Sequence, residues 1–198
     1  TGRTLEFLVN TNNNNREFVL STSDKFIINN NVNHGYSINY KENDFSSSKS
    51  YKLNTFALNT SFNYLFSDDT FHEIGFGYSL KDYQVTNSSA VSNNIKNSEG
   101  ESISFNISNE IIRNTLNSYI KPTNGNYFSF QNFVETPSSS TNGFIKNLII
   151  GKKYYELDNN ILSVQGKIGN IYSISNNEIL SDNKFSLGGR WLRGFDNF

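Results

Sequence analysis

The stretch that decides the fold lies near the C-terminal end: Phe185-Ser-Leu-Gly-Gly-Arg-Trp-Leu-Arg-Gly-Phe195. It follows a long polar connection, yet it carries five large apolar side chains, three glycines and two arginines in eleven positions. Gly188 and Gly189 permit backbone angles that other residues avoid, and they allow a second segment to approach closely. Arg193 precedes Gly194 and carries a guanidinium that is always charged. The composition therefore predicts a loop that folds inward, with Arg193 paired to an acidic wall.

The spacing F-x-L-G-G-x-x-L-R-G-F resembles the signature loop of the outer-membrane insertase superfamily, whose branches include BamA, TamA and the two-partner secretion transporters. The likeness is greatest to the BamA branch. It implies that the loop follows the eleventh strand of a sixteen-stranded barrel and enters the lumen. Arg190 and Trp191 depart from the pattern, because many relatives have small residues there. The matching residues are Phe185, Leu187, Gly188, Gly189, Leu192, Arg193, Gly194 and Phe195.

The composition of the chain argues against several classes of protein. A formal net charge of -1 and a pI near 6.1 give no basic surface of the kind that binds nucleic acid. The absence of cysteine excludes a disulfide scaffold, thiol catalysis and thiolate metal sites. Aromatic residues make up 15% of a chain whose mean hydropathy is negative, which favours strands with one apolar and one wet face. No apolar run approaches the roughly 18 residues of a membrane helix, so only a barrel could span a bilayer.

Alternation of apolar and polar residues recurs along the chain and predicts about nine strands. Residues 144–157 are less regular, so the facing of that strand stays open. We predict that the apolar set points to lipid: Phe56, Leu58, Phe62, Ile74, Phe76, Tyr78, Leu162, Val164 and Ile168. We predict that the alternating set points to the lumen: Asn59, Ser61, Gly75, Gly77, Ser163 and Gln165.

The connections alternate in length, as they do in outer-membrane barrels. Long polar connections are expected at residues 46–50, 82–100, 135–142 and from 175 onward, and short ones at 29–33, 67–70 and 158–160. This pattern predicts residues 82–100 at the cell surface and residues 158–160 in the periplasm. Residues 114–125 are the exception, because they form a long connection on the short side.

That exception carries a second motif. Arg113 ends a strand, and Pro122-Thr-Asn-Gly125 opens the next one. Proline fixes φ and glycine supplies an unusual turn geometry, which gives the turn a local physical explanation. The set Arg113, Pro122, Thr123 and Gly125 also resembles a second turn of the same superfamily.

The sequence contains few candidates for catalytic or metal-binding residues. His34 and His72 are the only histidines, and neither has partners at a spacing that indicates a metal site or a nucleophile. Asp68 and Asp69 lie in a short turn, where aspartate commonly bonds the local backbone. We therefore expect no catalytic, cofactor-binding or metal residues, and no enzyme activity.

These observations predict an all-β fold, a partial antiparallel transmembrane β-barrel of about nine strands out of sixteen. Residues 1–198 are expected to be a piece of one barrel domain, from about strand three to the signature loop, without the N-terminal POTRA domains and the last strands. The acidic partner of Arg193 is then expected outside the chain, although Glu6 and Glu73 belong to lumen-facing sets.

The resemblance implies a protein of the bacterial outer membrane that inserts other β-barrel proteins. Its partners would be the lipid bilayer, unfolded barrel substrates and accessory assembly lipoproteins, with no cofactor and no nucleic acid. A TamA-like protein or a two-partner secretion transporter is the alternative within the superfamily. A passive porin and a soluble β-sandwich are more distant alternatives.

Overall fold

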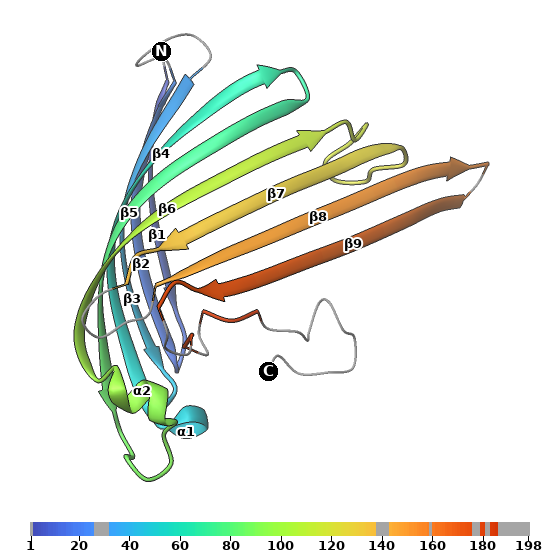
Figure 1. Ribbon diagram of the computed structural model, residues 1–198. Coiled ribbons are helices and arrows are strands. Elements are labelled where there is room, and N and C mark those ends of the chain that lie inside the picture. The colour runs from blue at the N-terminus through green and yellow to red at the C-terminus, as the bar shows by residue number, and fades with distance from the viewer. Residues whose placement is uncertain are drawn as a thin grey trace.

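The computed structural model of the protein contains a single antiparallel sheet. It describes residues 2–25, 32–137, 143–158, 160–175, 179–180 and 183–185. Nine strands follow one another in chain order, each paired with the next (Figure 1). Two short helices, α1 (Ser46–Lys49) and α2 (Asn93–Asn97), lie in connections. The strands are β1 (Arg3–Thr11), β2 (Asn15–Lys25), β3 (Val32–Asp44), β4 (Tyr51–Ser67), β5 (Thr70–Val85), β6 (Gly100–Asn114), β7 (Gly125–Glu135), β8 (Phe144–Leu157) and β9 (Asn160–Ser173).

The sheet curves into an open trough (Figure 1). Register assigns the residues to two faces, because side chains alternate along a strand and paired residues share a face. Leu58 pairs with Tyr78, whereas Asn59 pairs with Gly77. Leu180, from the chain after β9, is buried with Tyr51 and Tyr83, which share the face of Asn59 and Gly77. The polar face is therefore the concave one.

The convex face carries exposed aromatic and aliphatic side chains on every strand from β1 to β9. All residues predicted to face lipid lie on it, and all those predicted to face the lumen lie on the concave face. The predicted division between two faces is thus confirmed. The facing of β8 is also settled, because Ile149 pairs with Ile168 and Ile150 pairs with Lys167. Lys146, Leu148 and Ile150 consequently point into the trough.

The predicted alternation of connections is confirmed for most of the connections that the structure describes. Connection 12–14 is a short exception at the end with the long connections, because Asn14 lies beside Asp44. The predicted short connection 29–33 lies mostly outside the described residues. Connections 45–50, 86–99 and 136–143 and the chain after β9 lie at one end of the strands, where Figure 1 shows α1 and α2. Connections 68–69 and 158–159 are short and lie at the opposite end, together with the longer connection 115–124. Within the described ranges, no helix has the length and apolar character needed to cross a membrane.

Buried apolar side chains gather at the end with the long connections, on the concave face. This apolar cluster is made of Tyr51, Leu53, Tyr83, Val91, Ile95 and Leu180, with Phe45 and Val85 packed against it. Outside this cluster, the buried residues of the concave face are the large apolar Phe144, which pairs with Glu135 at the same end, and small or polar residues such as Ser104, Ser129 and Glu135. The buried part of the concave face is therefore mainly polar, with its large apolar side chains at one end.

Candidate functional site

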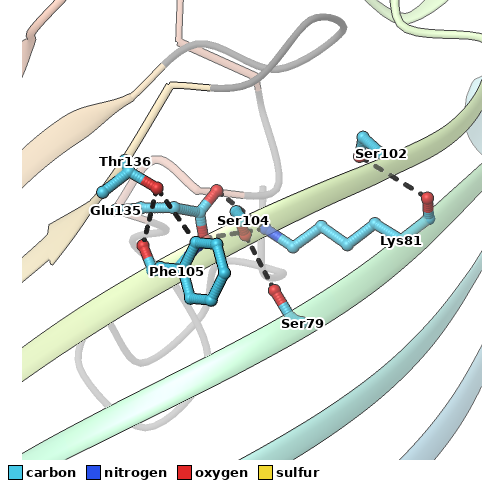
Figure 2. Close-up of polar contacts among 7 residues, drawn as sticks. All are labelled: Ser79, Lys81, Ser102, Ser104, Phe105, Glu135 and Thr136. Carbon is cyan, nitrogen blue, oxygen red and sulfur yellow. Dashed lines mark hydrogen bonds and ion pairs between the residues drawn. The ribbon is translucent and has the colours of Figure 1, made fainter.

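An ion pair between Lys81 and Glu135 is the most buried charged contact described in the trough. Lys81 lies on β5 and Glu135 ends β7, so the pair crosses over β6 (Figure 2). The Lys81 Nζ donates to both carboxylate oxygens of Glu135 at 2.9 Å. The two side chains are only 11% and 4% exposed. A buried pair with this bidentate geometry offsets part of the cost of removing both charges from water.

Hydroxyl groups surround the pair and hold the three strands together. Ser79 and Ser104 share a hydrogen bond of 2.8 Å beneath it. Thr136, which follows Glu135, accepts a hydrogen bond from the Phe105 backbone N–H at 3.1 Å and donates to the Phe105 carbonyl oxygen at 3.1 Å (Figure 2). These bonds extend the pairing of β6 and β7 beyond the end of the ladder, so Glu135 sits on a fixed backbone.

A second polar group lies further along the same face. The Glu110 carboxylate accepts hydrogen bonds from Ser129 at 2.8 Å and from Gln131 at 2.7 Å. Register places Glu73 opposite Glu110, and Glu6 opposite Ser21, so both predicted lumen-facing acids lie on the concave face. The trough is a fixed polar surface on which hydrogen-bonding groups are arranged in rows.

The chain after β9 is attached to this surface at several points. We call its described residues, 174–175, 179–180 and 183–185, the strap. The Ile174 backbone N–H donates to the Gly143 carbonyl oxygen at 2.8 Å. The Lys146 Nζ donates to the Asn183 carbonyl oxygen at 3.0 Å and lies 4.4 Å from the centre of the Phe185 ring. A cation in that position is attracted by the electron-rich face of the ring.

Gly169 on β9 makes room for Phe185. A Cβ atom at Gly169 would lie 2.7 Å from the Phe185 Cζ, which is closer than carbon atoms approach without a shift. Phe185 is the first residue of the signature stretch, and it lies against the inner wall formed by β8 and β9. The other signature residues, Leu187, Gly188, Gly189, Leu192, Arg193, Gly194 and Phe195, lie outside the described residues. Their roles and the partner of Arg193 stay predictions.

The second predicted turn is held by amide and hydroxyl groups. The Asn117 Oδ1 accepts hydrogen bonds from the backbone N–H groups of Thr123 at 3.0 Å and Asn124 at 3.1 Å. Gly125 has φ +109°, and a Cβ there would lie 2.8 Å from the Leu116 Cα. Only glycine fits both the dihedral angle and the space. Pro122 is half-buried within this turn.

Arg113 fixes the neighbouring turn rather than reaching the trough. Its Nε donates to the Asp69 Oδ2 at 3.1 Å. The Asp69 carboxylate also accepts hydrogen bonds from the hydroxyls of Ser67 and Thr70, at 2.6 and 2.8 Å. These two hydroxyls, and then Arg113, lower the pKa of Asp69 from 3.8 to about 2. The structure therefore separates Arg113 and its turn, at the short-connection end, from Phe185.

The two histidines take structural roles. The His34 Nε2 shares a hydrogen bond of 2.8 Å with the Thr60 hydroxyl, and its ring stacks on Phe62. His72 bonds the Asn109 side chain. The described residues contain no group of three or more His, Asp or Glu side chains that could hold a metal ion.

Sequence reasoning missed the Lys81–Glu135 pair, the Glu110 network and the burial of Leu180. The pair joins residues 54 positions apart, and only strand register brings them together. Leu180 follows Ile179, and the two form an aliphatic pair in a polar connection. That pair was the available signal, since large aliphatic residues in an otherwise polar loop often have a buried partner.

A curved sheet paired strand by strand, apolar outside and polar inside, defines the wall of a membrane β-barrel. Residues 1–198 match the Omp85 superfamily domain over their whole length, and the chain belongs to this superfamily. The superfamily and the outer-membrane barrel fold expected from the signature stretch are thus confirmed.

Among solved structures, the fold is similar to that of BamA from Haemophilus ducreyi lacking POTRA domains 1-3, with a TM-score of 0.85 and 19% sequence identity. The match covers 99% of this chain and 40% of that one. At this level of identity the likeness shows the fold. No curated protein matches the sequence.

Proposed function

We propose that this protein inserts and folds other β-barrel proteins in the bacterial outer membrane, as a BamA-like insertase. The observation that carries the proposal is the strap, whose Phe185, the first residue of the signature stretch, lies against the inner wall of an Omp85-superfamily barrel. The signature stretch argues against a passive porin. Membership of the superfamily and the BamA-like fold support the same proposal.

In this proposal the described strands provide a rigid wall and the strap holds the signature stretch against it. Substrate strands would pair at a seam between the first and last strands of the complete barrel. An unpaired strand edge is a template for another strand, so pairing of this kind needs no nucleotide and no covalent chemistry. Residues 1–198 would be one part of that barrel domain, which would also carry POTRA domains and bind accessory assembly lipoproteins.

The test uses the full-length gene in a bacterium whose own insertase can be depleted. Restored growth and restored levels of several unrelated barrel proteins are the expected result. A two-partner secretion transporter would export one partner protein and leave barrel assembly defective, and that outcome would replace the proposal. A TamA-like protein would rescue only a subset of substrates.

A further inference from the structure

The apolar cluster at one end of the trough joins segments that are distant in the sequence. Tyr51 and Leu53 come from β4 and Tyr83 from β5, whereas Val91 and Ile95 come from connection 86–99. Leu180 comes from the strap and is 3% exposed. An apolar cluster of this kind is unexpected on a face whose other buried residues are serines and the Lys81–Glu135 pair, with Phe144 as the one other large apolar side chain among the described residues.

Connection 86–99 is held in place by hydrogen bonds of its own and by one to Ser50. Its first residue, Thr86, donates a backbone hydrogen bond to the Ser50 carbonyl oxygen at 3.0 Å. The Val91 N–H donates to the Asn87 carbonyl oxygen at 3.1 Å, and the Ser98 hydroxyl donates to the Asn94 carbonyl oxygen at 3.0 Å. These bonds hold Val91 and Ile95 toward β4 and β5, so the segment and the two strands form a socket.

The strap therefore contacts two separated parts of the wall. Leu180 lies in the socket on β4 and β5, whereas Asn183 and Phe185 contact Lys146 and Gly169 on β8 and β9. Phe185 follows Leu180 by five positions, a span of at most about 18 Å when fully extended. Fixing Leu180 thus limits where the signature stretch can begin.

We propose that Leu180 is a positioning residue, which seats the strap in the socket and so sets the entry of the signature stretch into the trough. Its effect on activity rests on the proposed insertase function, because only then does the signature stretch act on a substrate. Its effect on the position of the strap does not depend on that function. Connection 86–99 becomes part of the machinery that holds the signature stretch, although it lies at the opposite side of the trough from β9.

The first test compares three variants of the full-length protein in lipid vesicles under limited trypsin digestion. Leu180→Ala leaves a cavity in the socket, so cleavage at Arg190 and Arg193 should become at least about tenfold faster. Leu180→Met refills the space and should restore slow cleavage. Ile174→Ala is the matched control, because Ile174 belongs to the same strap but is half exposed and lies outside the cluster.

Equal cleavage rates for Leu180→Ala and the wild type would overturn the proposal, as would equal acceleration by Ile174→Ala. If Leu180→Ala does not fold, a cysteine pair at Ile95 and Leu180 provides the second test. A short bis-maleimide should join this pair readily and should not join cysteines at Ile95 and Ile174. Failure to join the first pair overturns the proposal. Failure of the wild type to insert barrels refutes only the proposed function.

Discussion

At the scale of single residues, the Lys81–Glu135 pair is the contact whose loss should matter most. Glu135→Ala would leave the Lys81 ammonium nearly buried and unpaired, which typically costs about 3–5 kcal/mol. The double variant Lys81→Met with Glu135→Leu removes both charges and should recover most of the loss. Unfolding by urea in lipid vesicles would measure both effects.

The exposed pair of Lys52 and Asp44, whose side chains are 46% and 41% exposed, is the matched control. Lys52→Ala should change the unfolding free energy by less than about 1 kcal/mol, because water screens an exposed pair. Similar losses from Lys52→Ala and Glu135→Ala would mean that burial of the ion pair is not what stabilises the wall.

The signature stretch predicts that Arg193 docks the loop against an acidic partner. A guanidinium that leaves water needs a carboxylate and further acceptors, so Arg193→Ala should loosen the stretch and impair growth in the depletion strain. Arg193→Lys should rescue only in part, because lysine keeps the charge but loses the planar fork. Arg190→Ala should have little effect. Full growth and an unchanged digestion pattern for Arg193→Ala would show that this arginine does not dock the loop.

Asp69 should stay ionised in acid that protonates ordinary carboxylates. Its folded-state pKa of about 2 lies below the ordinary 3.8, so its contribution to stability is present above pH 3.8 and is lost as pH falls through about 2. A carboxyl-carbon NMR titration should report the low value, and Ser67→Ala should raise it toward 3.8, with a smaller rise for Arg113→Gln. An ordinary titration midpoint in the wild type would contradict the hydrogen-bonded turn.

At the scale of the element, β9 offers a direct test of the two faces. Val164 and Gln165 are adjacent and exposed, and register places them on opposite faces of the sheet. A spin label at residue 164 should therefore contact lipid, and one at residue 165 should contact water. Oxygen and nickel accessibility in vesicles would separate the two environments. Reversed accessibilities would mean that the polar face contacts lipid.

The connections test the orientation of the strands in the membrane. Connection 86–99 is longer than connections 68–69 and 158–159 at the other end, and long connections lie outside the cell in outer-membrane barrels. An epitope inserted at the exposed Ser89 should be detected on intact cells. Detection only after the outer membrane has been permeabilised would place this end of the trough in the periplasm.

At the scale of the whole molecule, the fold could be predicted because most strands carry a two-residue period of apolar and polar residues. Phe56 to Phe66 on β4 reveal their facing without any knowledge of neighbours, whereas Leu148-Ile-Ile150 on β8 does not, because both faces are apolar there. The contacts of the trough could not be predicted in the same way. Lys81 meets Glu135, and Leu180 meets Tyr83, only after several strands have set the register.

The burial of Val91 and Ile95 beside Leu180 limits which positions of connection 86–99 can change during evolution. Antibodies and bacteriophages select for altered outer surfaces, and connection 86–99 is on the predicted outer side. Exposed positions such as Ser88 and Asn93 can vary under that selection, whereas the exposed Asn87 also accepts a hydrogen bond from the Ser89 backbone N–H at 3.1 Å. Positions 91 and 95 cannot vary in this way, because a polar substitution there would disrupt the apolar contacts that hold Leu180 of the strap. Connection 86–99 would thus diversify around two fixed apolar positions.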